Sequence, residues 1–167
     1  TGLREPRTIV RRLFGESLYL ARVVELRGWL VDVGSGAGFP GLALKLVAPA
    51  LRITLIESNH SKCAFLKEVV RECGFSAVDV VAARFEDWCA GGAPRGRGDL
   101  VTTRAVSVDT RLLQAIGTVV AENGKAAFLT TAALAEVISR KGLNWAWEPV
   151  HPVPQTSGSV ILVGSHM

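Results

Sequence analysis

The chain has few of the residues that build metal sites and covalent cross-links. Its three cysteines, Cys63, Cys73 and Cys89, cannot all pair, and their spacings of 10 and 16 residues fit no zinc motif. The three histidines lie too far apart in sequence to suggest a ligand cluster. We therefore expect reduced thiols, no metal and a cytoplasmic protein.

Long apolar runs are also absent. No uncharged stretch approaches the roughly 18 residues of a membrane span, and no signal peptide is recognisable, so no membrane partner is expected. The chain has no repeat period and no low-complexity tract. Apolar residues nevertheless make up 49% of its 167 positions, and its mean hydropathy is +0.30. These values exclude disordered and fibrous classes and predict one domain with a real core.

The net charge of +4 is unevenly distributed. Residues 1–27 contain six Arg against three Glu, and residues 84–104 contain four Arg against three acidic residues. The rest of the chain is balanced. A solvated surface and a nucleic-acid footprint are both compatible with an excess of this size.

The hydrophobic pattern predicts alternating helices and strands. Helices are expected over 6–27, 39–47, 59–73, 110–121 and 132–141, and strands over 29–33, 51–57, 78–82, 100–103 and 125–130, with a glycine-rich loop over 91–98. Two final strands, 145–150 and 159–163, have no room for a helix between them and should pair antiparallel. We therefore predict an α/β fold with a mainly parallel seven-stranded sheet and an antiparallel C-terminal hairpin.

Three segments follow from this pattern. Residues 1–27 form a helical arm, residues 28–163 form the main domain, and residues 164–167 look like a remnant of cloning that carries no function. Open parallel sheets bind ligands outside the carboxyl ends of their strands. The site is therefore expected in the loops after Val33, Ile56, Ala82 and Thr103.

The first of these loops is rich in glycine. It reads Asp-Val-Gly-Ser-Gly-Ala-Gly-Phe-Pro-Gly over residues 32–41, and Glu57 ends the next strand 21 residues after Gly36. Read from Gly36, the loop fits the dinucleotide pattern G-x-G-x-x-G. Read from Gly34, it fits the D-x-G-x-G-x-G pattern of S-adenosyl-L-methionine (SAM) methyltransferases. In both interpretations the glycines let a nucleotide approach the backbone, and the acid accepts ribose hydroxyls.

The charge of Asp32 separates the two interpretations. A dinucleotide would place its pyrophosphate at the mouth of the loop, where a carboxylate is repulsive. SAM has no phosphate and carries a sulfonium and an ammonium, beside which a carboxylate is favourable. The loop therefore favours SAM over a nicotinamide or flavin dinucleotide.

Four segments resemble the RsmG (GidB) family, the guanine-N7 methyltransferases of 16S ribosomal RNA. They are the loop at 32–41 with its Phe-Pro-Gly ending, Lys-Cys-Ala-Phe-Leu at 62–66, Ala-Arg-Phe-Glu-Asp-Trp at 83–88 and Thr-Arg-Ala at 103–105. Upstream, Arg-Glu-Pro at 4–6 and Glu-Ser-Leu at 16–18 resemble the family's R-D-P and D-S-L. The resemblance runs over about residues 1–130 and implies a Rossmann-like class I SAM-dependent fold.

The resemblance also implies residue roles. Gly34 and Phe39 would contact SAM, Glu57 would hold the ribose, and Phe85 and Glu86 would sit at the adenine. Arg104 would lie in the cleft between cofactor and substrate. Together with Asp32, the expected cofactor site comprises Asp32, Gly34, Gly36, Gly38, Phe39, Glu57, Phe85, Glu86 and Arg104.

The implied partner is 16S rRNA or the small ribosomal subunit, bound by a monomer. Phosphate contacts are expected from Arg7, Arg11, Arg12, Arg95, Arg97 and Arg104, and a solvated helix face is the alternative for Arg7 and Arg11. Guanine N7 carries an in-plane lone pair with no proton to remove, so no catalytic base is expected. The base must leave its stack, because N7 faces the deep groove of A-form RNA.

Two positions depart from the family pattern. Leu13 occupies the place of a histidine, and Thr130 stands where the family has a lysine. These departures leave two other hypotheses open: a SAM-dependent enzyme with a small-molecule or protein acceptor, and an RNA-binding relic without activity.

Overall fold

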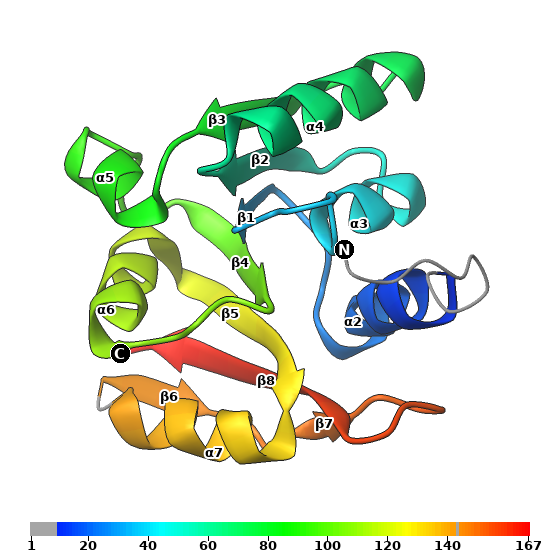
Figure 1. Ribbon diagram of the computed structural model, residues 1–167. Helices are drawn as coiled ribbons and strands as arrows, with labels where there is room; N and C mark the ends of the chain where they lie inside the picture. Colours follow the sequence, from blue (N-terminus) through cyan, green and yellow to red (C-terminus); the bar gives the residue numbers. More distant parts are fainter. Residues whose placement is uncertain (1–9, 143) are drawn as a thin grey trace.

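The computed structural model describes residues 10–142 and 144–167 of the chain, which form one central sheet with helices on both faces (Figure 1). The strands are β1 (Trp29–Val33), β2 (Arg52–Glu57), β3 (Val78–Ala82), β4 (Gly98–Arg104), β5 (Val120–Thr131), β6 (Trp145–Trp147), β7 (His151–Pro152) and β8 (Ser159–His166). Their order is β3-β2-β1-β4-β5-β8-β6, and the short β7 also pairs with β8. Strands β1 to β5 run parallel, and β8 is antiparallel to β5. The predicted α/β architecture is confirmed.

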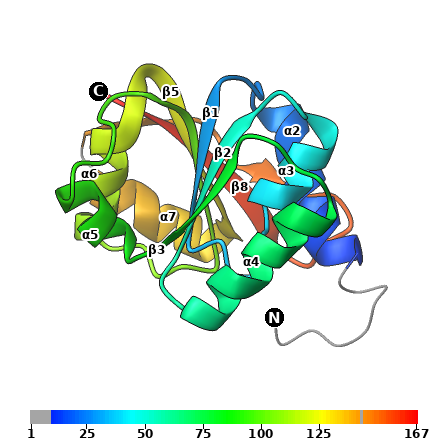
Figure 2. The same ribbon diagram turned by 90° about the horizontal axis from the view of Figure 1, so that it is seen from above.

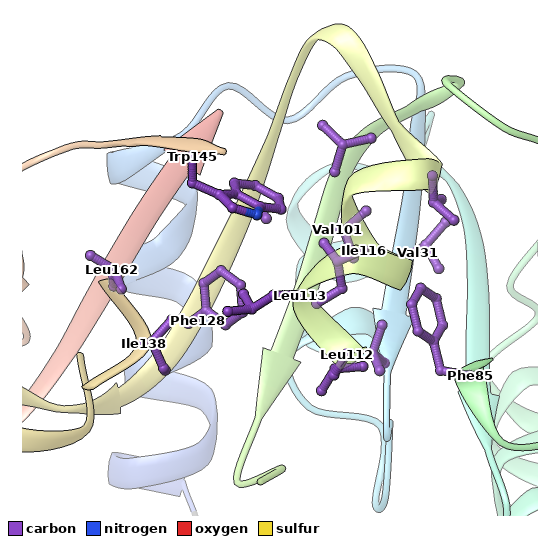
Figure 3. Close-up of a cluster of buried hydrophobic side chains, with 14 of the residues drawn as sticks. Val31, Phe85, Val101, Leu112, Leu113, Ile116, Phe128, Ile138, Trp145 and Leu162 are labelled. Carbon is purple, nitrogen blue, oxygen red and sulfur yellow. The ribbon is translucent and has the colours of Figure 1, made fainter. Parts of the chain in front are cut away.

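The helices divide between the two faces (Figure 2). The π-helical turn η1 (Val10–Phe14), α2 (Gly15–Val23), α3 (Gly41–Val47) and α4 (His60–Glu72) belong to one side, and α5 (Phe85–Ala90), α6 (Thr110–Val119) and α7 (Ala132–Lys141) to the other. Each face has its own core. One cluster joins Leu20, Leu42 and Leu66 to the sheet, and the other packs α6 and α7 over Phe128 (Figure 3). Both faces of β1 and β2 are thus buried, which explains their continuous apolar runs, whereas the edge strand β3 is only half-buried.

Several helix boundaries follow from local capping. The side chain of Asn59 accepts a hydrogen bond from Lys62 N at 3.0 Å, which fixes the start of α4 as predicted. Asp109 caps α6 in the same way, through Leu112 N at 2.8 Å. Helix α7 has the bounds that the sequence predicts.

The C-terminal region is more elaborate than the predicted hairpin. The antiparallel pairing of β6 with β8 is confirmed, but the expected strand over 145–150 is shortened to β6, and the two-residue β7 follows it, so the sheet has eight strands rather than seven. Residues 164–166, which were expected to lie outside the main domain, complete β8. The ring of His166 packs edge-on against Trp145 with centroids 5.2 Å apart. These residues are therefore structurally part of the sheet.

Two further differences concern helices. The arm helix ends at Val23 rather than at residue 27, and residues 1–9 lie outside the described part. Helix α5 was missed because six residues are too short for a periodic signal; Phe85 buries its ring against the core there. In the described ranges no helix is long and apolar enough to cross a membrane.

Candidate functional site

The glycine loop lies at the carboxyl ends of β1 and β2. Gly34 N and Ser35 N both donate to Ile56 O, at 2.8 and 3.1 Å, so the loop is tied over the end of β2. Gly34, Gly36 and Gly38 have φ values of 68°, 57° and 91°. At Gly34 an added Cβ would also lie 2.6 Å from Cγ2 of Val106, so this position has no room for a side chain.

Gly36 has the open surroundings that a nucleotide needs. An added Cβ there would meet only Gly34 O, at 3.7 Å, so the backbone is accessible to a ligand. Its N–H donates to Oε2 of Glu57 at 2.9 Å. The loop thus presents free space beside an acidic side chain, and the residues present fit a nucleoside cofactor.

Glu57 links the loop to the start of α4. Its Oε1 accepts from Asn59 N at 2.8 Å, while its Oε2 accepts from Gly36 N. The residue is 7% exposed. Because each carboxylate oxygen has two lone pairs, both retain an acceptor site for a ribose hydroxyl. The two backbone contacts therefore orient the Glu57 carboxylate and leave an acceptor site free on each of its oxygens.

Asp32 is placed differently from the expectation. Its side chain is completely buried; Oδ1 accepts from Thr102 Oγ1 at 2.7 Å, and Oδ2 accepts from Gly41 N at 3.3 Å. Burial raises the pKa of this carboxyl to about 6, against the lowering effect of these hydrogen bonds. Asp32 therefore supports the loop and the start of α3 from beneath. The predicted direct contact with a cofactor cation is not supported, because no part of the side chain reaches the surface.

The aromatic residues of the expected cofactor site also serve packing. Phe39 lies edge-on to Phe14 of η1, with ring centroids 4.8 Å apart. Phe85 is 4% exposed and packs near Trp88, so its ring belongs to the core on that face of the sheet. Glu86, in the first turn of α5, is exposed. Of the expected adenine pair, only Glu86 presents its side chain to solvent.

Arg104 ends β4 and binds the N-terminal helix. Its Nη2 and Nε lie 2.9 and 3.1 Å from Oε2 of Glu16, and Ser159 Oγ donates to Oε1 of Glu16 at 2.9 Å. The side chains of Arg104 and Glu16 are 19% and 6% exposed. This network joins α2, β4 and β8. Glu16 belongs to the Glu-Ser-Leu segment that resembles the family's D-S-L, and no pattern in the sequence predicts its pairing with Arg104.

A cavity of about 530 Å³ opens beside this network, at the carboxyl ends of β4 and β5. Its walls come from η1, α2, the segment after β4, α7 and β8. They include three basic side chains, those of Arg12, Arg104 and Lys141, and the single acid Glu16. Val106 lines the cavity and also packs against Gly34, so the cavity and the glycine loop share a wall. A ligand in one would adjoin a ligand in the other.

The expected RNA-binding arginines do not gather in one place. Arg12 lines the cavity with Arg104, but Arg95 and Arg97 lie before β4, at the opposite end of that strand. Seven residues of strand separate the two ends by about 20 Å. Figure 1 shows β4 running from the α5 side of the molecule toward α2. Arg7 and the side chain of Arg11 lie outside the described part.

The two departures from the family pattern have different settings. Leu13 is a core residue, 2% exposed, whose carbonyl accepts from Ser17 Oγ. Thr130 lines the cavity, so the missing lysine would have faced the same space as Arg12 and Arg104. Among the described residues, no group of three or more His, Cys, Asp or Glu side chains is arranged to hold a metal ion.

A model of the GidB family, described as rRNA small subunit methyltransferase G, matches residues 1–153. The chain belongs to the GidB family. A ribosomal RNA small subunit methyltransferase G from Xylella fastidiosa is 37% identical over 172 residues, covering 98% of this chain and 76% of the relative. Another from Rubrobacter xylanophilus is 41% identical over 108 residues, covering 64% of this chain and 41% of the relative. The resemblance identified from the sequence is confirmed.

Solved structures agree with the GidB assignment at the level of fold. A SAM-dependent methyltransferase from Aquifex aeolicus superposes with a TM-score of 0.73 at 16% identity, covering 96% of this chain and 93% of that chain. A variant of MtNAS in complex with S-adenosylmethionine gives a TM-score of 0.71 at 16% identity, covering 99% of this chain and 68% of that chain. The predicted class I methyltransferase fold is thus confirmed.

Proposed function

We propose that this chain transfers a methyl group from SAM to guanine N7 of 16S rRNA in the small ribosomal subunit. One observation carries the proposal: the glycine loop and the basic cavity share Val106 as a common wall. A cofactor at the loop and an acceptor in the cavity would therefore lie side by side at Val106. An rRNA acceptor would place the reaction in the cytoplasm, and we expect a monomer to carry it out.

The cofactor would occupy the space above Gly36. Glu57, already oriented by two backbone N–H groups, would accept the ribose hydroxyls. Gly34 and Gly38 would keep the loop backbone close to the ligand, with Phe39 at its end and Glu86 placed for the adenine amine. SAM, when bound, supplies an electrophilic methyl group on a sulfonium.

The protein's part in the chemistry would be orientation and exclusion of water. Guanine N7 is unprotonated at neutral pH and needs no base, so the residues have only to align its lone pair. The cavity walls would hold an extruded base away from solvent. Arg104, fixed by Glu16, would position the base or its phosphate rather than move a proton.

RNA would be held by positive charge at the cavity mouth. Arg12, Arg104 and Lys141 outnumber Glu16 there, which favours a phosphate backbone. Thr130 adds no charge where the family has a lysine. Its place in the cavity is the observation that keeps a small-molecule or protein acceptor as the second candidate.

The decisive experiment is transfer of labelled methyl from SAM to small subunits that lack the modification, followed by mapping of the methylated base. Incorporation at one guanine N7 is expected. The affinity for rRNA should also fall steeply as salt rises, because bound phosphates release counterions. SAM binding without methylation of any RNA, together with salt-independent RNA affinity, would overturn the proposal and favour a different acceptor.

A further inference from the structure

One polar atom at the site has no partner. The Oγ1 of Thr103 is buried, and the described residues offer it no hydrogen bond. Thr103 as a whole is 3% exposed. Buried hydroxyl groups are nearly always hydrogen bonded, since an unsatisfied one is destabilising. An unpaired hydroxyl on a residue that lines a cavity is therefore available as a hydrogen-bond partner for a ligand in that cavity.

The position of Thr103 on β4 directs its side chain to that cavity. Successive strand residues point to opposite faces of a sheet, and Thr102 points toward Asp32, with which it is hydrogen bonded. Thr103 faces the other side, where it lines the cavity together with its register partner Phe128. In the neighbouring strand its partner is Val33, the residue before the glycine loop. The hydroxyl thus lies on the cofactor side of the cavity.

The rest of the cavity has the composition that a nucleobase needs. Val106 and Val108 form one apolar wall, and Leu134 and Val137 of α7 form another. The last two are 54% and 44% exposed, so their side chains are accessible to a ligand. Apolar walls can enclose the two faces of a base, while Arg12 and Arg104 meet its phosphate at the rim.

We propose that Thr103 is a specificity residue: its hydroxyl donates a hydrogen bond to O6 of the accepting guanine, whose faces pack between the valine wall and α7. O6 adjoins N7 on the same edge of guanine, and both are acceptors. A donor on the cofactor side of the cavity would therefore hold O6 while N7 faces the methyl group. This proposal rests on the proposed function.

The test compares Thr103→Val, which removes the hydroxyl with little change of shape, with Thr103→Ser, which keeps it. For Thr103→Val we expect kcat/KM toward small subunits to fall about tenfold, the effect of one neutral hydrogen bond, with SAM affinity unchanged. Thr103→Ser should stay close to the wild-type value. The matched control is Thr118→Val at an exposed position of α6 that does not line the cavity; its hydroxyl donates to Ala115 O, and no change of kcat/KM is expected.

A modified acceptor identifies the atom that is bound. In subunits reconstituted with 2-aminopurine, which lacks O6, at the target position, wild type and Thr103→Val should methylate at equal rates. Equal rates on guanine, a loss that persists on 2-aminopurine, or a weakened SAM affinity would each overturn this proposal. If the wild-type protein methylates no RNA, the proposed function fails and this proposal fails with it; loss of the Thr103 effect alone leaves the proposed function standing.

Discussion

The guanidinium of Arg104 binds the carboxylate of Glu16 at 2.9 Å across 88 residues of sequence. Because Glu16 belongs to the N-terminal helix and Arg104 ends the central strand β4, this ion pair couples the arm to the site. Ser159 of β8 holds the other oxygen of Glu16. The arm is therefore part of the site rather than an appendage to the domain.

Replacing Glu16 should disturb both stability and RNA handling. We expect Glu16→Gln to lower the free energy of unfolding by about 2 kcal/mol, because Arg104 keeps a mostly buried charge without its counterion. KM for rRNA should rise while SAM affinity stays close to wild type. Urea unfolding and methyl-transfer kinetics measure the two effects. Glu25→Gln, at an exposed pair with Arg27, is the control and should change stability by less than about 0.5 kcal/mol. Equal effects of the two variants would contradict the coupling.

Glu57 should be needed for the cofactor but not for the fold as a whole. Glu57→Ala removes the proposed ribose acceptor and the bond that orients Gly36, so SAM affinity should drop about a hundredfold. Titration calorimetry measures this, with circular dichroism to verify folding. Glu122→Ala, an exposed acid at the far end of β5, should bind SAM as wild type does. Unchanged affinity in Glu57→Ala would remove this residue from the ribose role.

Asp32 predicts an unusual pH dependence of stability. Its pKa is raised from 3.8 to about 6 in the folded protein, so the folded state holds a proton that the unfolded state has already lost between these pH values. The contribution of this group is therefore most favourable below about pH 4 and is lost as pH rises toward 6. Over that range the change amounts to about 3 kcal/mol.

The variant Asp32→Asn tests this contribution. Its amide oxygen can still accept from Gly41 N, and Thr102 can rotate its hydroxyl to accept from the amide. Urea unfolding at pH 4, 5, 6 and 7.5 should show a smaller decline of stability with pH for the variant than for wild type. Parallel curves for the two proteins would show that Asp32 does not hold its proton.

The effect of replacing an arginine on rRNA binding should depend on where the arginine lies. Arg12→Ala removes a charge at the cavity mouth and should weaken rRNA binding about tenfold at low salt, with a shallower salt dependence. Arg95→Ala and Arg97→Ala change charges at the opposite end of β4 and should have smaller effects. Filter-binding titrations at several salt concentrations separate the cases. A larger loss for Arg95 or Arg97 than for Arg12 would place the RNA on the other edge of the sheet.

Much of the fold could be predicted from local patterns in the sequence. The Asn59 cap, the apolar runs of the parallel strands and the bounds of α7 are visible in the sequence because each depends on neighbours a few residues away. The glycine loop with Glu57 was recognisable for a similar reason. The spacing between the loop and Glu57 is that of one strand–helix–strand unit, and the length of this unit places the acid at the end of the second strand, beside the loop.

The sequence by itself thus determined the α/β class, the glycine loop, the family and the acid that ends the strand after the loop. Only the tertiary structure decided that Asp32 is buried beneath the loop, that Arg104 pairs with Glu16, and that Arg95 and Arg97 lie away from the cavity. The physical reason is that burial and ion pairing depend on which segments meet in space. Glu16, Arg104 and Ser159 meet through the packing of α2 against the sheet, and no pattern along the chain records such a contact.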